Sequence, residues 1–124
     1  MNVYDLNRMQ PQSVNELYKR TIAQGEKVSV AKLVVRKGAT TRRHRHPHEE
    51  VIVVLQGSWM FHLPEGDVTL RPNQVLTIAP GVEHASEVLE DVVALDICTP
   101  TREDWIKQED LELHTDGDQF LWAV

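Results

Sequence analysis

The residues best suited to chemistry in this sequence are two histidines and a glutamate that follow one another closely, His44, His46 and Glu50. If one strand carries both histidines, side-chain alternation places their rings on the same side, about 7 Å apart. The turn expected at residues 47–49 then brings Glu50 back to the same point. Imidazole nitrogens together with a carboxylate suit Fe, Mn, Co, Ni or Zn. We therefore expect this stretch to bind one divalent metal ion, whose identity the ligand types leave open.

A further histidine follows a segment that has the pattern of a strand and a tight turn. The segment contains the apolar run 75–78, then Pro80-Gly81, and ends at His84. If the sheet closes into a barrel, a histidine that opens the next strand reaches the first group of ligands. The predicted metal ligands are therefore His44, His46, Glu50 and His84.

One charged residue interrupts an apolar run near the end of the expected sheet. Asp96 lies within residues 92–98, and alternation places it on the same face as Ala94 and Cys98. A carboxylate in such a run needs either a partner or a functional cavity. Two interpretations follow: Asp96 is a general acid or base beside the metal, or it forms a salt bridge to a nearby arginine.

Two arginines are candidates for holding an acidic substrate. Arg102 follows the strand that carries Asp96, and its planar guanidinium matches a carboxylate, although an arginine after a strand is just as typical of the surface. Arg42 shares the alternation of His44 and His46, so we expect it to point inward as a second anion contact. Together with the metal, these residues indicate a small acidic molecule as the substrate.

Short runs rich in valine, isoleucine and leucine predict an all-β fold. The expected strands are 28–35, 51–55, 58–63, 75–78 and 92–97, with turn signals between them that include Gln56-Gly57. Many short strands at close spacing are typical of a sandwich or a barrel. Short helical segments are expected only near the termini, one at 13–17 and one after Thr101, whose hydroxyl is expected to cap it.

Length and composition limit the remaining possibilities. The 124 residues have room for one hydrophobic core, so we expect a single domain, and the net charge of −6 argues against general nucleic-acid binding. Residues 1–20 lack the apolar run of a signal peptide, and no stretch approaches the length of a membrane span. Cys98 is the only cysteine, so an internal disulfide is impossible. We expect a cytoplasmic protein with neither a membrane nor a nucleic-acid partner.

The end of the chain is acidic. Residues 103–118 carry seven of the nineteen acids, so most of this segment is expected on the surface, with Trp105, Phe120 and Trp122 docking parts of it on a sheet edge or a partner subunit. His62 and His114 are interpreted as ordinary surface or strand histidines.

The spacing of the candidate ligands resembles the cupin superfamily. Its first motif is matched at every specified position, as Gly38, five residues, His44-Arg45-His46, three residues, Glu50, six residues and Gly57. In the second motif, Gly81 and His84 match. The motif usually has glycine, proline and asparagine at three further positions, and this sequence has Asn73, Ala79 and Val88 there instead. The resemblance implies a single antiparallel, jelly-roll-like β-barrel over about residues 25–100, with the tail 103–124 outside it. It also implies a homodimer, because paired barrels are frequent in the superfamily.

A narrower resemblance is to the pectin-degradation cupins of the KdgF type, carried by residues 25–27, 44–50 and 94–105. Members of that family convert 4,5-unsaturated monouronates from pectin or alginate to linear keto acids. Their acid on the strand after the last histidine and the arginine that follows match Asp96 and Arg102. Glu50 stands where that family commonly has glutamine, and Cys98 where an aromatic residue is expected. The resemblance implies a metal-dependent isomerase or lyase, in which Asp96 moves a proton and Arg102, with Arg42, holds the carboxylate.

Two other functional classes remain open. The same set of three histidines and one glutamate occurs in cupin dioxygenases, where Fe(II) with free positions activates oxygen. A cupin that binds a small molecule without catalysis is the second alternative, although the chain has no helix pair for DNA binding that such a module would regulate.

Overall fold

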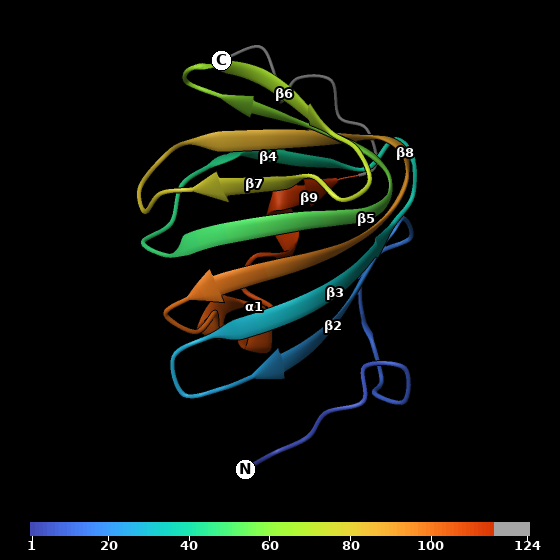
Figure 1. Ribbon diagram of the computed structural model, residues 1–124, viewed down its shortest axis with the longest axis vertical. Coiled ribbons are helices and arrows are strands. Elements are labelled where there is room, and N and C mark those ends of the chain that lie inside the picture. Colours follow the sequence, from blue (N-terminus) through green and yellow to red (C-terminus); the bar gives the residue numbers. More distant parts are fainter. Residues whose placement is uncertain (116–124) are drawn as a thin grey trace.

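The computed structural model describes residues 1–115 and confirms the predicted all-β fold (Figure 1). None of the helices in this range has the length and apolar character of a membrane span. The strands in chain order are β1 (Gln12–Asn15), β2 (Tyr18–Gln24), β3 (Ser29–Val35), β4 (Thr40–His44), β5 (Glu49–Leu63), β6 (Gly66–Leu70), β7 (Val75–Ile78), β8 (His84–Thr99) and β9 (His114–Thr115). Helix α1 (Glu103–Lys107) and the short 3-10 helix η1 (Leu111–Leu113) lie between β8 and β9.

Antiparallel pairing links the nine strands of residues 1–115 into one curved sheet. The order β1-β2-β3-β8-β4-β9 forms one part, and β5 joins it by pairing with β8 while also pairing with β6 and β7. The long strand β8 therefore contacts β3, β4 and β5, and the sheet rolls into a nearly closed barrel. Figure 1 shows α1 inside the curve of this sheet, and β9 pairs with β4 at one edge of it.

Side-chain alternation fills the interior of the barrel. In β3, Ala31 and Leu33 are fully buried, whereas Lys32 between them is only partly buried. The same period in β8 buries Ala94, Asp96 and Cys98, so the predicted shared face of these three residues is the interior. Apolar side chains thus make up most of the core, and in β8 the Asp96 carboxyl group is placed among them.

The turn predicted at Gln56-Gly57 is wrong. Strand β5 continues through these residues without reversing, and its pairing with β8 shifts register around Gly57. Gly57 has a φ of 83° and forms a bulge, because the backbone of Asp91 passes so close that a Cβ at position 57 would overlap the Asp91 carbonyl oxygen. A bulge and a turn both use glycine at positive φ, so the local sequence does not distinguish them.

We expect Gly57→Ala to lower the free energy of unfolding by at least about 3 kcal/mol, because the strained φ and the steric overlap add together. Gly66→Ala is the matched control: Gly66 has a φ of 130°, but an added Cβ meets nothing within 4 Å. This control should lose only about 1–2 kcal/mol. Urea denaturation measures both variants, and equal losses would show that the approach of Asp91 has no energetic effect.

The helical prediction after Thr101 is confirmed in its position but wrong in its cap. Helix α1 begins at Glu103, and its N-cap residue, Arg102, makes no side-chain capping bond. The Thr101 hydroxyl instead donates to Glu103 Oε1 at 3.2 Å. The Arg102 side chain is therefore available to the interior of the barrel.

The helical prediction near residue 13 is wrong. Residues 12–15 form β1, and the following turn is closed by a hydrogen bond from the Leu17 N–H to Asn15 Oδ1 at 2.8 Å. Pairing with β2 and burial of Val14 favour the strand over local helix propensity.

The described part of the acidic segment, residues 103–115, closes one side of the barrel. Glu103 and Glu109 are exposed as expected, but Trp105 and Asp110 are buried, and β9 pairs with β4 at the sheet edge. The expected docking through Trp105 is confirmed, whereas Phe120 and Trp122 lie outside the described residues. The segment thus adds side chains to the interior that the surface prediction did not anticipate.

Candidate metal and substrate site

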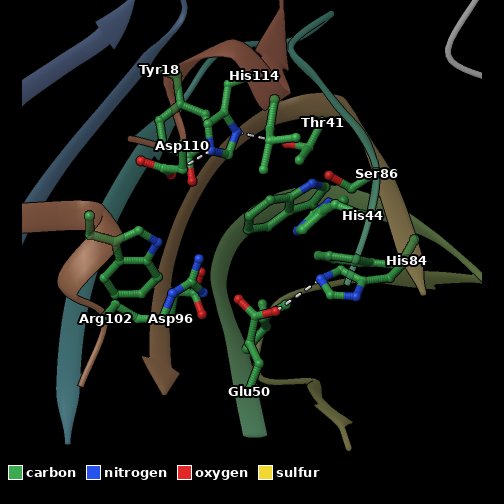
Figure 2. Close-up of a pocket in the computed structure, with 15 residues that line it drawn as sticks. Tyr18, Thr41, His44, Glu50, His84, Ser86, Asp96, Arg102, Asp110 and His114 are labelled. Atoms are coloured by element: carbon green, nitrogen blue, oxygen red, sulfur yellow. Dashed lines mark hydrogen bonds and ion pairs between the residues drawn. The ribbon is translucent and has the colours of Figure 1, made fainter. Parts of the chain in front are cut away.

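A cavity of about 40 Å³, open to solvent at its mouth, lies inside the barrel (Figure 2). Residues of β4, β5 and β8 form its walls, and residues of α1, η1 and β9 close one side. Five of the predicted site residues line it, namely His44, Glu50, His84, Asp96 and Arg102.

The three predicted histidine ligands converge although different elements carry them. His44 ends β4, His84 opens β8, and these two residues pair across the strands. His46 lies in the loop after β4, so the expectation that one strand carries both early histidines is wrong. A ring nitrogen from each of the three lies within 4.8 Å of the others. Convergence therefore depends on the β4–β8 pairing and on the loop at residues 45–48.

Backbone hydrogen bonds orient all three imidazole rings in the same way. Each Nδ1 lies within 3.1 Å of the carbonyl oxygen of a residue two positions away, at Arg42, His48 and Val82 respectively. A carbonyl oxygen only accepts, so each Nδ1 donates its proton, and the neutral ring keeps its lone pair on Nε2. Second-shell bonds of this kind orient metal-ligating histidines. Burial, followed by the neighbouring His84, also lowers the pKa of His44 to about 4, so that this ring is neutral near pH 7.

Glu50 completes the cluster from the start of β5. Its Oε1 lies 3.3 Å from His46 Nε2 and 3.2 Å from His84 Nε2. Neither contact has hydrogen-bond geometry, and both Glu50 Oε1 and His46 Nε2 are buried without a hydrogen-bond partner among residues 1–115. Burial alone would raise the pKa of Glu50, but the two imidazoles hold it well below its ordinary value. Three nitrogen lone pairs and one carboxylate therefore face a common point, an arrangement that fits a divalent transition-metal ion.

Asp96 lies beside this cluster, on the wall formed by β8. One carboxylate oxygen of Asp96, one of Glu50 and the Cys98 sulfur all lie within 4.8 Å of one another. Burial, followed by the charge of Glu50, raises the pKa of Asp96 well above its ordinary value. Of the two interpretations of this residue, the salt bridge is not found, because Asp96 forms no ion pair with an arginine of residues 1–115. Burial and then Asp96 raise the pKa of Cys98, so its thiol stays protonated.

Arg102 is buried rather than on the surface, but one edge of its guanidinium already has a partner. Its Nε and Nη2 donate to the Asp104 carboxylate at 2.9 and 2.8 Å. The group stacks on the Trp105 ring at 4.5 Å from the ring centroid, and Nη1 donates to the Cys98 sulfur at 3.5 Å. These contacts engage three of the five guanidinium N–H bonds, and the two that they leave, one on Nη1 and one on Nη2, can donate to a substrate carboxylate.

The inward orientation predicted for Arg42 is wrong. Its side chain is exposed, and it is not among the residues that line the cavity. The pairing of β4 with β8 shifts register between Thr41 and His44, so strict alternation does not extend along β4. Thr41 faces the cavity in its place.

Sequence reasoning missed a group at the side of the cavity that the C-terminal segment closes. His114, interpreted as an ordinary histidine, contacts Thr41 Oγ1 at 3.0 Å and Asp110 Oδ2 at 3.1 Å. Its ring also packs on Tyr18, with 4.6 Å between ring centroids. The signal in the sequence was an acid and a histidine four residues apart beyond a buried tryptophan, but nothing local indicated their partners.

Asp110 is held by a buried ion pair with Arg20, which has 1% exposure and also escaped the sequence analysis. Arg20 Nη1 and Nη2 donate to the two Asp110 oxygens at 2.6 and 2.8 Å. Burial alone would raise the pKa of Asp110, but the hydrogen bonds from Arg20 and His114 hold it far below its ordinary value. The pair ties η1 and β9 to the barrel.

We expect Asp110→Asn to lower the free energy of unfolding by about 3–5 kcal/mol at pH 7, because the Arg20 charge is left buried without its partner. Since the pKa of Asp110 is lowered on folding, the carboxylate contributes fully at pH values above its unfolded pKa of about 3.9 and loses its contribution as pH falls below it. Urea denaturation at pH 7 and pH 3 checks both points. The difference between variant and parent should shrink at pH 3, and an equal difference at both would contradict the assignment.

The matched control for this prediction is Asp5→Asn. Asp5 pairs with Arg8 at 3.6 Å on the surface, where both side chains are largely exposed. An exposed pair contributes at most about 1 kcal/mol, so the control should be close to the parent at either pH.

Known structures with the same fold cover nearly the whole chain. KdgF from Halomonas sp. is 22% identical, with a TM-score of 0.78 over 84% of this chain and 99% of that one. An RmlC-like cupin from Shewanella frigidimarina NCIMB 400 is 20% identical, with a TM-score of 0.79 over 85% and 96%. Ectoine synthase from P. lautus is 13% identical, with a TM-score of 0.78 over 93% and 88%. At these identities the likeness establishes the fold alone.

Sequence comparison identifies the family independently. No curated protein matches this sequence significantly. The cupin domain family, however, matches residues 31–98, a range that runs from β3 to the end of β8 and contains all four candidate metal ligands. The chain therefore belongs to the cupin family, as a small cupin with a nearly closed antiparallel β-barrel.

Proposed function

We propose that His44, His46, Glu50 and His84 hold one divalent metal ion, and that the protein opens and tautomerises 4,5-unsaturated monouronates to linear keto acids. The observation that carries this proposal is the position of Asp96, a buried carboxyl group within the same cavity as the converging ligands. The KdgF-like fold supports the choice of substrate class. When bound, the ion supplies Lewis-acid stabilisation of negative charge on substrate oxygens.

The reaction requires proton movement and nothing else. Hemiacetal opening moves a proton from the anomeric hydroxyl to the ring oxygen as the bond between C1 and the ring oxygen breaks, which leaves an aldehyde at C1 and an enol at C5. Tautomerisation then transfers the enol proton to C4 and forms the ketone. Every atom of the substrate remains in the product, so the reaction needs no oxidant, reductant or covalent nucleophile. The protein must therefore supply a proton carrier and hold the substrate in place.

Asp96 is the proton carrier in this proposal. It lines the cavity beside Glu50, on the strand that also carries His84. Arg102 holds the substrate carboxylate through its remaining Nη1 and Nη2 N–H bonds, and the Asp104 carboxylate and the Trp105 ring keep the guanidinium in one orientation. The uronate carboxylate then lies beside Asp96, which places C4 and C5 near the proton carrier.

The direct test is to incubate metal-loaded protein with unsaturated galacturonate and follow the loss of the conjugated double bond by ultraviolet absorbance. Protein loaded separately with Mn, Fe, Co, Ni and Zn should accelerate this loss over buffer with at least one metal. A rate equal to that of buffer with all five would exclude the uronate activity. Oxygen consumption with Fe(II)-loaded protein, measured at an electrode, distinguishes a dioxygenase.

A further inference from the structure

The cavity has a second polar region, apart from the metal ligands. Figure 2 shows Tyr18, Thr41 and His114 grouped on one side of the cavity, with Glu50 and Asp96 on the other. Tyr18 and Thr41 have exposed fractions of 5% and 7%, and both line the cavity. The proton-transfer chemistry proposed above uses neither of them. Polar side chains buried beside an enclosed space are candidates for ligand contacts.

Thr41 presents an acceptor to the cavity because its proton is engaged elsewhere. Asp110 is ionised by its pairing with Arg20 and can only accept, so His114 Nε2 donates to it. His114 Nδ1 lies 3.0 Å from Thr41 Oγ1, and in the tautomer that carries its proton on Nε2 this Nδ1 accepts the proton of the Thr41 hydroxyl. The remaining lone pairs of Thr41 Oγ1 are directed away from His114. His114 thus fixes the polarity of the Thr41 hydroxyl.

Tyr18 presents a donor. Its ring packs on His114, and its hydroxyl has no hydrogen-bond partner among residues 1–115. Burial, followed by the charge of Asp96, raises the pKa of Tyr18, so the phenol keeps its proton. Ser86, which pairs with Thr41 across β4 and β8, adds a buried hydroxyl that can donate or accept.

We propose that Tyr18, Thr41 and Ser86 form a subsite that binds the hydroxyl groups of a sugar ring, with His114 as the residue that positions Thr41. An adjacent donor and acceptor match an alcohol, which both gives and accepts a hydrogen bond, and they disfavour a second carboxylate, which only accepts. The inference rests on the proposed function, in which Arg102 holds the carboxylate of the same ligand, and it adds the residues that contact the hydroxyl groups. A ring acid with several hydroxyls should bind better than one without them.

Binding of two non-reacting acids to the metal-loaded full-length chain tests the subsite. Galacturonate carries the carboxylate and the ring hydroxyls, whereas tetrahydropyran-2-carboxylate carries the carboxylate on a bare ring. Isothermal titration should show galacturonate binding at least about 10-fold more tightly. Thr41→Val and Tyr18→Phe should each lower the affinity for galacturonate by about 3- to 10-fold, the equivalent of one hydrogen bond. The affinity of each variant for the bare ring acid should stay within about 2-fold of the parent.

Thr40→Val is the matched control. Thr40 is also a buried threonine of β4, but its hydroxyl bonds to Thr115 and it does not line the cavity. It should leave the affinities for both acids unchanged. If Thr41→Val and Thr40→Val have equal effects, or if each variant weakens both acids equally, the subsite is wrong. Thermal unfolding of each variant confirms that it is folded at the titration temperature.

The role of His114 is tested by a double-mutant cycle. If His114 acts by fixing the Thr41 hydroxyl, His114→Ala should lower the affinity of the parent protein for galacturonate. In the Thr41→Val background the same substitution should lower that affinity by no more than about 2-fold. Independent losses in the two backgrounds would show that His114 has only a structural role.

The outcomes also separate this inference from the proposed function. Hydroxyl-dependent binding without turnover of unsaturated galacturonate would leave the subsite standing and exclude the uronate reaction. Turnover of unsaturated galacturonate, combined with unchanged galacturonate binding in Thr41→Val and Tyr18→Phe, would support the uronate reaction and exclude the subsite. If the parent protein binds neither acid, the subsite is excluded.

Discussion

Replacement of His84 by alanine is expected to weaken the binding of a divalent metal by at least about 100-fold. His84 is one of three histidines whose ring nitrogens lie within 4.8 Å of one another, and its Nε2 lies 3.2 Å from Glu50 Oε1. Removing a residue that only hydrogen-bonds to a metal ligand typically lowers the metal affinity by about 10- to 100-fold, so removing a ligand itself should lower it further. Competition with a chelating dye measures the affinity, and elemental analysis measures the metal retained after gel filtration.

His62→Ala is the control for this variant. His62 also lies in the sheet, but its Nδ1 contacts Asp67 Oδ1 at 2.6 Å, outside the cavity. The control should retain the metal content of the parent. Metal should also raise the unfolding temperature of the parent and of His62→Ala, but not that of His84→Ala, because only a protein that binds the ion in its folded state is stabilised by it. Equal metal content in His84→Ala and the parent would remove the metal site.

Replacement of Asp96 by asparagine should lower the turnover of unsaturated galacturonate by about 100- to 10,000-fold, the usual contribution of a positioned acid or base. Asparagine has nearly the same volume as aspartate but cannot exchange a proton at its side chain. The buried pocket between Glu50 and Cys98 should therefore accept it without rearrangement. Ultraviolet absorbance at saturating substrate measures the rate, and elemental analysis checks that the metal content is that of the parent.

Asp91→Asn is the control for the Asp96 variant. Asp91 is an exposed acid on the same strand, where it accepts a hydrogen bond from the backbone N–H of Lys37 at 2.8 Å. It should keep the parent rate. If Asp96→Asn also turns over substrate at the parent rate with full metal content, Asp96 is not the proton carrier, whatever the reaction.

The barrel and the convergence of the four candidate ligands could be predicted because local patterns encode both. Apolar alternation predicts strands, and the short spacing from His44 to Glu50 leaves little freedom in where those side chains lie. Asp96 was recognisable for a similar reason, since a carboxyl group in an apolar strand must face either a partner or a cavity. The strands, the spacing from His44 to Glu50 and the position of Asp96 are each read from one segment, whereas the approach of His84 to the other ligands depends on the pairing of β4 with β8.

Other features depend on register and on packing between distant segments. The register shift in β4 turns Arg42 outward and Thr41 inward, although alternation from His44 predicts the opposite. The bulge at Gly57 has the same local signal as a turn, and only the approach of Asp91 distinguishes them.

What the sequence determined by itself is the family, the strand pattern, and which nitrogen and oxygen ligands are spaced to share an ion. The tertiary structure alone decided which polar groups enter the cavity from elsewhere. His114 and Asp110 reach it because Arg20, some ninety positions earlier, supplies the opposite charge, and Arg102 offers one edge because Asp104 occupies the other. The physical reason is that a buried polar group is stable only with a partner, and that partner is chosen by proximity in space rather than along the chain.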